Sequence, residues 1–435
     1  MTSTNLALWQ PAKASAIEKT GLEASAAVDG NPATRWSSAF QSNQWIDIDL
    51  GKAQIINTVS LTWEAAYAKA YSIQVSLDEK TWTTVYSTTT GVGGTEKITF
   101  EPVNARYVRM QGVKPARYSY SLYDFSVHNS LVTDSVFAAD SFWYHQIPAD
   151  APIDPNSANL TLNLTQQIKT YYNNVILNTT SYASPVYVVP EGVPTVPVKF
   201  WDCQGKGYTP AGILDQWAAV PIPSYAQPAT GTDAEMTIYQ PSTDTLWEFW
   251  QTKVVNGVWQ ACWGGRLQNA SKNNGTWPSG FGTTATGLPF LGGQISAEEL
   301  QRGEICHAIG ISLVDVETYW KYSWPAQRSD GYNPTSAANR IAEGQRFRLD
   351  PTVNVDALKI HPVAKTIAKA AQKYGFIVWD KAGSVSLRAW NPKGYTLAGK
   401  VDPYAALFNG TANYALLNGF PWDKLQFLPM NYGKV

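Results

Sequence analysis

A recurring alternation of polar and apolar residues in short stretches restricts the fold of this chain more than any other feature. Four such stretches are 45–50, 58–63, 71–76 and 106–110, and Gly, Asn, Asp and Pro residues separate them. Successive side chains of a strand point to opposite faces, so each stretch is typical of a strand with one buried face. The pattern predicts an all-β sandwich over residues 1–130.

The rest of the chain is long enough for a second domain, because an ordinary domain has roughly 100–200 residues and the chain has 435. The segment 147–155 is rich in Pro and Asp, and we expect a linker over 131–155. Residues 156–435 again read as mostly β, which predicts a larger β-sandwich domain with a few short helices. We expect one helix over 362–374, stopped by Gly375, and a shorter one that starts near Ser296 with a capping-box pattern.

Charge and hydropathy narrow the classes of partner. The formal net charge is −1 and only 15% of residues are charged, so we expect no nucleic-acid partner. No apolar run reaches the length of a membrane span, so we expect no membrane insertion. We also expect the protein to be a monomer. The chain has 18 Trp and 23 Tyr residues, and flat aromatic faces suit the C–H faces of sugar rings. A Trp-rich β core is the alternative explanation.

Five ordered motifs in the first domain carry a resemblance to a known family. They occupy 27–36, 45–51, 71–78, 106–109 and 120–127. Together they resemble the coagulation-factor type C, or discoidin, family, and within it the family 32 carbohydrate-binding modules. The resemblance covers nearly all of residues 5–128. It implies a jelly-roll β-sandwich, a polysaccharide partner and a secreted, extracellular protein, although the N-terminus lacks the pattern of a signal peptide.

The same resemblance implies a structural Ca²⁺ ion where the loop around Gly30 meets the last strand. Its ligands would be Asp29, Asn31, Thr34 and Asp124. Asp124 occupies a position where the family usually has Glu, and its side chain is one methylene group shorter. Oxygen ligands from a tight loop suit Ca²⁺, but the loop is alternatively a plain turn whose Asp caps its own backbone.

Sugar in such modules is held on loops at one end of the sandwich. The candidates here are Trp63, Tyr67, Tyr118 and Tyr120. In contrast, Trp36, Trp45 and Trp82 sit inside the family motifs, and we expect them in the core.

The second domain resembles an uncharacterised family of secreted bacterial proteins. The stretches that carry this resemblance are 231–236, 246–250, 286–293, 303–308, 324–328 and 346–350. No activity comes with it, so the chemistry has to be inferred from the residues.

The segment from 232 to 266 reads as two successive hairpins whose register follows from their turns. If Gln240 faces Thr245, then Thr237 faces Glu248 and Glu235 faces Trp250. Alternation then assigns Met236, Ile238, Trp247 and Phe249 to one apolar face. It assigns Asp233, Glu235, Tyr239, Glu248 and Trp250 to the other face. The type I′ turn predicted at 256–257 places Trp263 opposite Trp250 on that second face.

This second face suggests glycoside hydrolysis. On the predicted register Glu235 and Glu248 are diagonal neighbours, with Cβ atoms roughly 7 Å apart, which suits the acid pair of a retaining glycosidase. Asp233 would raise the pKa of Glu235 by like-charge repulsion, and Trp250 and Trp263 would be the sugar platforms. The alternative is that these acids form surface ion pairs with Arg or Lys residues.

A second reading is a β-elimination lyase. His307 would be the base, Tyr239 the proton donor, and Arg328 the group that neutralises a uronate. The alternative is a hydrogen-bonded core histidine. Of the three cysteines, Cys203 and Cys306 could pair, whereas Cys262 lies in a predicted strand.

The sequence therefore predicts a secreted glycoside hydrolase, endo-acting on a β-glucan, with an N-terminal carbohydrate-binding module. The alternatives are a polysaccharide lyase and a non-catalytic glycan-binding adhesin.

Overall fold

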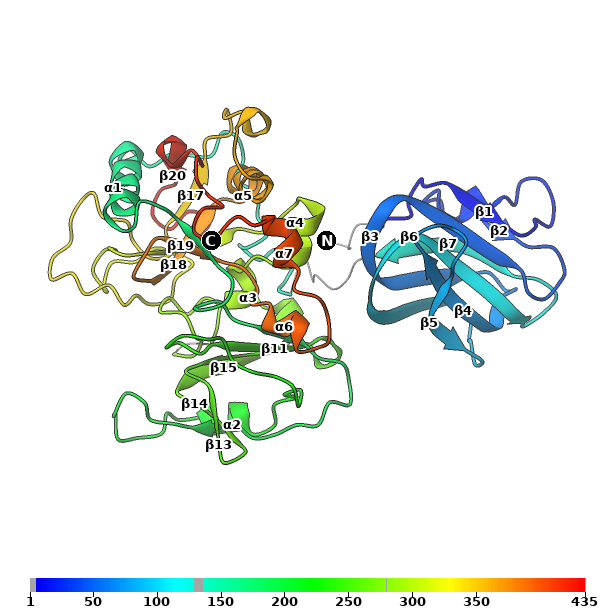
Figure 1. Ribbon diagram of the computed structural model, residues 1–435, viewed down its shortest axis with the longest axis horizontal. Helices are drawn as coiled ribbons and strands as arrows, with labels where there is room; N and C mark the ends of the chain where they lie inside the picture. The colour runs from blue at the N-terminus through cyan, green and yellow to red at the C-terminus, as the bar shows by residue number, and fades with distance from the viewer. Residues whose placement is uncertain (1–4, 129–135, 279, 435) are drawn as a thin grey trace. The chain divides into compact units, whose positions relative to one another are not determined.

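The computed structural model describes residues 5–128, 136–278 and 280–434 (Figure 1). The chain forms two compact units, Met1–Asp134 and Ser135–Val435, which are described separately. Strands outweigh helices among the described residues, so the predicted mostly-β fold class is confirmed. None of the helices found in those residues is both long enough and apolar enough for a membrane crossing.

The N-terminal unit is a seven-stranded jelly roll. Its elements are β1 (Ala12–Ala14), the 3₁₀ helix η1 (Ala24–Ala27), β2 (Trp36–Ser37), β3 (Trp45–Trp63), β4 (Ala68–Ser76), β5 (Thr83–Thr88), β6 (Thr95–Pro115) and β7 (Ser121–His128). The strand order is β2-β7-β3-β6-β4-β5, with β1 paired to β3. The register of β3 against β6 shifts at two places, and such irregularities bend long strands around a core. Apolar side chains such as Trp36, Ile48 and Val108 fill that core, and the predicted jelly roll is confirmed.

The second unit contains three sheets and the helices that pack on them, so it is more elaborate than the two-layer sandwich that the sequence predicts. The three-stranded sheet has the order β10 (Lys199–Phe200), β14 (Val258–Ala261), β13 (Lys253–Val255). The four-stranded sheet has the order β15 (Trp263–Gln268), β12 (Thr245–Trp250), β11 (Met236–Gln240), β9 (Val186–Val188). The six-stranded sheet has the order β20 (Leu425–Phe427), β17 (Arg346–Leu349), β18 (Phe376–Lys381), β16 (Ile309–Leu313), β19 (Ser386–Arg388), β8 (Ile176–Asn178).

Two helices confirm the sequence signals, and the longest helix was not predicted. The α-helices are α1 (Ser157–Thr170), α2 (Ile213–Trp217), α3 (Phe290–Gly293), α4 (Ala297–Arg302), α5 (Pro362–Lys373), α6 (Lys393–Thr396) and α7 (Tyr404–Phe408). The 3₁₀ helices are η2 (Pro241–Thr243), η3 (Ala270–Lys272), η4 (Val355–Ala357) and η5 (Trp422–Lys424). Helix α5 ends before Gly375, which adopts a φ of 76°, and α4 starts with the capping box of Ser296 and Glu299. The unpredicted helix is α1.

The segment after the N-terminal unit differs from the expected linker over 131–155. Residues 131–135 lie outside the described residues, but from Val136 onward the chain belongs to the second unit. Phe137, Phe142 and Trp143 are buried there in one apolar cluster with Trp379. Large aromatic side chains bind this segment to the core, although its Pro and Asp content resembles that of a linker.

The predicted hairpins are present with the predicted register. Gln240 pairs with Thr245, Thr237 with Glu248, and Trp250 with Trp263. The residues at 256–257 both have a positive φ, as a type I′ turn requires. The apolar face of this sheet, made by Met236, Ile238, Trp247 and Phe249, lies in the core as predicted.

A disulfide joins Cys203 to Cys262, so the suggested pairing of Cys203 with Cys306 is wrong. Backbone pairing explains the difference. The strand β10, which precedes Cys203, lies parallel to β14, which precedes Cys262, so the two sulfurs meet just beyond the ends of both strands.

Candidate functional site

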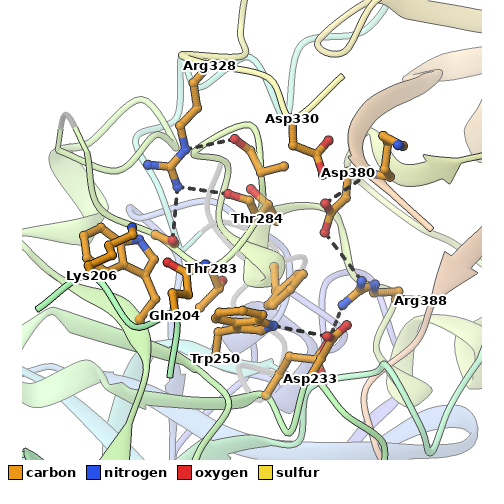
Figure 2. Close-up of a pocket in the computed structure, with 16 residues that line it drawn as sticks. Gln204, Lys206, Asp233, Trp250, Thr283, Thr284, Arg328, Asp330, Asp380 and Arg388 are labelled. Atoms are coloured by element: carbon orange, nitrogen blue, oxygen red, sulfur yellow. Dashed lines mark hydrogen bonds and ion pairs between the residues drawn. The ribbon is translucent and has the colours of Figure 1, made fainter. Parts of the chain in front are cut away.

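A cavity of about 430 Å³ opens in the second unit beside the ends of β12 and β18 (Figure 2). Five of the side chains that the sequence singled out line it, namely Asp233, Glu235, Trp250, Trp263 and Arg328. The shared face predicted from strand alternation thus brings acids and indoles to one opening in the protein surface. Concave sites of this kind, with aromatic walls and a few convergent polar groups, are where ligands usually bind.

Asp233 and Glu235 lie just before β11, and the backbone between them is strained. Ala234 adopts a φ of 39°, which is uncommon for a residue with a side chain. Such outliers often occur at functional sites. Asp233 is half-buried and accepts a hydrogen bond from the indole Nε1 of Trp250 at 3.2 Å. Both carboxylates on either side of this strained residue line the cavity.

Glu235 is buried and forms an ion pair with Arg388. Its Oε1 lies 2.6 Å from Nη1 of Arg388, and its Oε2 has no partner among the described residues. Burial raises the pKa of the Glu235 carboxyl, and the guanidinium of Arg388 opposes that rise. The paired carboxylate therefore lines the cavity as a buried group.

Glu248 does not line the cavity, and the catalytic role predicted for it is contradicted. Its side chain has no exposed surface. The carboxylate accepts hydrogen bonds from the backbone N–H groups of Phe290 and Leu291, at 3.0 and 2.9 Å, and from the Thr283 hydroxyl at 2.8 Å. Burial raises its pKa to about 7, and the three donors oppose that rise. The strand register is as predicted, but α3 covers this position, so Glu248 anchors α3.

Arg328 shapes the cavity instead of presenting a free charge to it. Its guanidinium donates to the backbone carbonyls of Ala285, Gly282 and Thr284, at 2.9, 3.2 and 3.1 Å (Figure 2). Burial lowers its pKa. These bonds hold the 282–285 segment, which forms one wall.

His307 and Tyr239, the other two residues of the predicted lyase, lie away from the cavity. His307 is buried; its Nδ1 lies 2.8 Å from the Ala308 carbonyl oxygen and its Nε2 lies 3.2 Å from Oε1 of Glu299. Although burial works to raise the pKa of Glu299, the His307 imidazole and other partners lower it to about 2. Tyr239 is buried in an apolar cluster, and burial raises its pKa to about 12. Both side chains are part of the interior, so these two predictions are wrong.

Three further carboxylates, which the sequence did not reveal, gather at the opposite wall. Asp330 and Asp380 line the cavity, and Glu343 lies behind them. Burial raises the pKa of Asp380 to about 7 and that of Glu343 to about 8, with repulsion from Asp330 adding to both. The three residues come from separate segments, and no local spacing marks them in the sequence.

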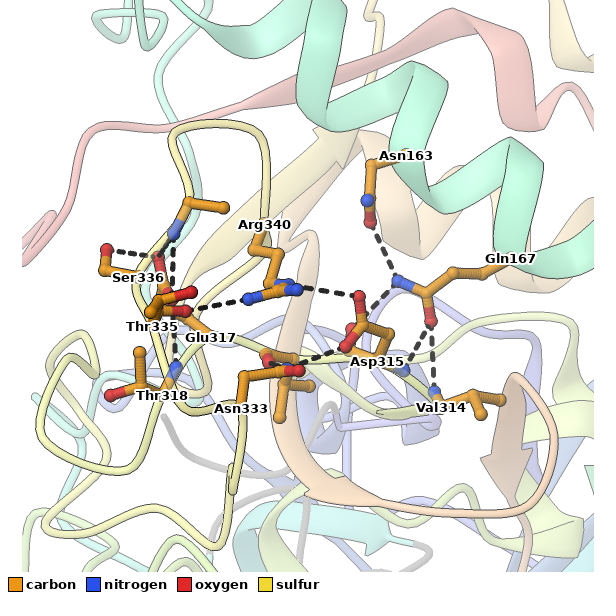
Figure 3. A network of polar contacts seen from close by, with 12 residues as sticks. Asn163, Gln167, Val314, Asp315, Glu317, Thr318, Asn333, Thr335, Ser336 and Arg340 are labelled. Atoms are coloured by element: carbon orange, nitrogen blue, oxygen red, sulfur yellow. Dashed lines mark hydrogen bonds and ion pairs between the residues drawn. The ribbon is translucent and has the colours of Figure 1, made fainter.

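A polar network holds the loop that carries Asp330 (Figure 3). The buried carboxylate of Glu317 accepts hydrogen bonds from Ser336 and from Lys321, at 2.9 and 3.1 Å. Asp315 forms an ion pair with Arg340 at 3.3 Å. The loop between β16 and β17 is therefore tied down on the side away from the cavity.

In the N-terminal unit, the structure separates the four predicted sugar-contacting residues. Tyr118 is 79% exposed and Tyr67 is half-buried. Tyr120 and Trp63 are buried; Tyr120 packs closely against Gly112, and the Trp63 indole donates to Glu96 at 3.0 Å. A sugar cannot stack on a buried ring, so the predictions for Tyr120 and Trp63 are wrong. Trp63 is the last residue of β3, Tyr120 directly precedes β7, and both rings join the apolar core.

The predicted core tryptophans differ in their surroundings. Trp36 is fully buried, as predicted. Trp45 and Trp82 enclose the guanidinium of Arg109, whose carbon lies 4.2 and 3.9 Å from their ring centres. Arg109 also pairs with Asp47 at 2.8 Å. Both indoles are half-buried around this cation, so they lie at the edge of the core that was predicted for them.

The loop of Asp29 brings oxygen atoms together in the same unit. The Thr34 hydroxyl donates to Oδ2 of Asp29 at 2.7 Å and lies 2.9 Å from the Asn31 carbonyl oxygen. Burial raises the pKa of Asp124, and the charge of Asp29 adds to the rise, so the two carboxylates are neighbours. All of these are hard oxygen donors of the kind that Ca²⁺ prefers, and the residues present fit such an ion.

Comparison with known proteins supports the jelly-roll assignment. A family model described as NedA-like, galactose-binding domain matches residues 26–110. The N-terminal unit is a discoidin-like domain. The predicted resemblance of this part is therefore confirmed.

Solved structures similar to the discoidin-like domain include carbohydrate-binding modules. Chitosan-binding module 1 of a chitosanase/glucanase from Paenibacillus sp. IK-5 is 52% identical and covers 29% of this chain and 98% of its own, with a TM-score of 0.28. The family 32 module of NanJ from C. perfringens, solved with galactose, is 21% identical and covers 27% of this chain and 92% of its own, with a TM-score of 0.25.

A curated relative is also a polysaccharide-active protein. Polysaccharide lyase 8 family protein HylA of Enterococcus faecalis (strain ATCC 700802 / V583) is 37% identical over 91 residues. The match spans 20% of this chain and 7% of that relative.

Proposed function

We propose that the cavity of the second unit is the active site of a polysaccharide-degrading enzyme, and that the discoidin-like domain binds the glycan. One observation carries this proposal: Asp233, Glu235, Trp250 and Trp263 line the same cavity. Sugar rings need flat aromatic faces for stacking, and glycosidic bond cleavage needs carboxyl groups. The N-terminal module would keep the enzyme on its substrate.

The chemistry that this geometry supports best is hydrolysis. Burial raises the pKa of Glu235, so its carboxyl keeps a proton to higher pH and suits a general acid. Its Oε2 is buried and has no partner among the described residues, so we assign the transferable proton to this oxygen. Asp233, held by the Trp250 indole, would stabilise the positive charge that develops on the sugar or act as nucleophile.

The two indoles would set the position of the sugar. Trp250 is half-buried and fixed through its bond to Asp233. Trp263 stacks on Phe281 with ring centres 6.0 Å apart, which leaves it half-buried and rigid. An endo-acting cleavage of a β-glucan remains the specific substrate proposal.

The lyase alternative finds less support in the cavity. No described residue that lines it is a histidine or a tyrosine. The Nε and Nη2 groups of Arg328 are already bound to three carbonyls, which leaves Nη1 as the group that could meet a uronate. A lyase here would take its base from the lining lysines, Lys206 and Lys381, or from a lining carboxylate.

A glycan panel tests the proposal. The full chain is incubated with β-glucans, chitosan, hyaluronan and alginate, and both reducing ends and the ultraviolet absorbance of a new double bond are recorded. We expect reducing ends without the double bond. Asp233→Asn and Glu235→Gln should each lower kcat by about 10²-fold or more, whereas Glu191→Gln, at an exposed loop position, should not. Formation of the double bond would show that the protein is a lyase and not a hydrolase. No turnover on any glycan would indicate a binding protein without catalytic activity.

We also propose that the discoidin-like domain holds Ca²⁺ through Asp29, Asn31, Thr34 and Asp124, and that the protein is an extracellular monomer. The ion would be structural, so its removal should lower the thermal midpoint of that domain. Calorimetry with EDTA and then with added CaCl₂ tests this, with Asp29→Asn as the variant that should no longer respond.

A further inference from the structure

One wall of the cavity carries more negative charge than its neighbours balance. Asp330, Glu343 and Asp380 each direct one carboxylate oxygen to a common point, and these oxygens lie within 4.8 Å of one another. Asp380 is the penultimate residue of β18, while the other two residues belong to the loop between β16 and β17. Like charges at this separation repel strongly inside a protein.

The nearby cations offset this charge only in part, because the closest of them is shared with another acid. Arg388 lies 3.6 Å from Oδ2 of Asp380, but its other nitrogen, Nη1, is the partner of Glu235 at 2.6 Å. The ammonium of Lys381 lies 3.4 Å from the ring centre of Tyr332. Within the described part of the chain, no ion pair joins Lys381 to the three carboxylates. Among the described residues, Arg388 is therefore the cation within ion-pair distance of this cluster, and it is shared with Glu235.

The buried side chain of Glu343 is a second, independent observation that points to a bound ligand. The residue is 1% exposed, and its Oε1 is buried without a hydrogen-bond partner among the described residues. Its Oε2 accepts the backbone N–H of Asp330 at 3.1 Å. A buried carboxylate oxygen without a donor is unfavourable by itself, and buried charges are usually paired or bound to a metal.

We propose that Asp330, Glu343 and Asp380 bind a divalent metal ion of the Ca²⁺ type in the cavity wall. Ca²⁺ takes carboxylate oxygens at 2.3–2.6 Å, so two of its ligands can be at most about 5 Å apart, and this set satisfies that limit. Asp330 and Asp380 line the cavity, so the remaining coordination positions face it and are available to water or to sugar hydroxyls. This site is separate from the one in the discoidin-like domain and concerns binding alone, so it does not depend on the hydrolase assignment.

The fold is suited to holding such an ion. Asp380 is fixed at the end of a central strand, and the network of Asp315, Glu317 and Arg340 ties down the loop that carries Asp330 (Figure 3). Ligands on a restrained scaffold lose little freedom when the ion binds. Sharing of protons among the three acids is the competing explanation, and it requires no metal.

Metal titration of the full chain separates the two explanations. The Asp29→Asn chain serves as parent, so that the proposed site in the discoidin-like domain does not contribute. After treatment with EDTA and desalting, bound Ca²⁺, Mg²⁺ and Mn²⁺ are each measured by equilibrium dialysis with elemental analysis. We expect one bound Ca²⁺ per parent chain, which Glu343→Gln and Asp330→Asn each abolish and Glu191→Gln retains.

Thermal midpoints provide the second readout and report on folding. Added CaCl₂ should raise the thermal midpoint of the parent above its value in EDTA but should not move that of Glu343→Gln, which should stay folded in both conditions. The proposal is overturned if the parent binds none of the three ions, or if binding survives both Glu343→Gln and the milder Asp330→Asn. In that case the acids share protons instead.

Discussion

Replacing Glu248 by Gln should destabilise the second unit without removing a catalytic group. The carboxylate accepts three hydrogen bonds in a position with no exposed surface. A glutamine keeps one acceptor oxygen but turns an NH₂ group toward donors, so at least one of the N–H groups of Phe290 and Leu291 loses its partner. A buried donor left without an acceptor costs about 1–3 kcal/mol. With one or two donors affected, we expect a loss of about 2–4 kcal/mol at neutral pH.

Calorimetry of the full chain measures this loss. For a unit of this size, 1 kcal/mol shifts the thermal midpoint by about 2–4 °C, so the expected decrease is on the order of 10 °C. The midpoint of the discoidin-like domain should not move. At a temperature where the variant stays folded, kcat should remain close to that of the wild type. An unchanged midpoint together with loss of turnover as severe as that of Asp233→Asn would refute the structural role and restore Glu248 as a catalytic residue.

Three further predictions concern stability. Arg388→Met leaves Glu235 as an unpaired buried carboxylate and should cost about 3–5 kcal/mol, measured by urea unfolding; an unchanged unfolding midpoint would mean that the pair contributes nothing. Replacing both cysteines of the Cys203–Cys262 disulfide opens a loop of 59 residues and should cost up to about 4 kcal/mol, whereas wild-type stability in the double serine variant would contradict the pairing. Glu299 has a folded-state pKa of about 2, below its unfolded value, so its contribution is complete above about pH 4.5 and is lost as the pH falls toward 2. Between about pH 4.5 and pH 2 the free energy of unfolding should therefore fall by about 3 kcal/mol in the wild type and by much less in Glu299→Gln. An equal dependence of that free energy on pH in the two proteins would contradict this prediction.

The sequence predicted local geometry well because turns and alternation act over a few residues. The Pro-Ser-Thr-Asp and Asn-Gly turns were enough to align Thr237 with Glu248 and Trp250 with Trp263, and both pairs are present. Helix α5 was also predictable, because its apolar stripe and its terminal glycine are clear. Helix α1 was not, because Asn and Thr residues, which are weak helix formers, occupy much of it, and burial of Leu160 and Leu164 stabilises it instead.

The site itself was only partly predictable, because alternation assigns a side chain to a face but does not say what covers that face. Glu248 shares a strand with Trp250, yet α3, about 40 residues further along the chain, covers one and leaves the other at the cavity. The same reason hid the cluster of Asp330, Glu343 and Asp380. These residues meet only through tertiary folding, which no short motif records.

The most direct test is a crystal structure of the Asp233→Asn variant soaked with an oligosaccharide that the wild type cleaves. We expect a sugar ring stacked on Trp250 or Trp263, with a glycosidic oxygen within hydrogen-bonding reach of Glu235. Sugar density confined to the discoidin-like domain, with the cavity of the second unit empty at saturating oligosaccharide, would contradict this expectation.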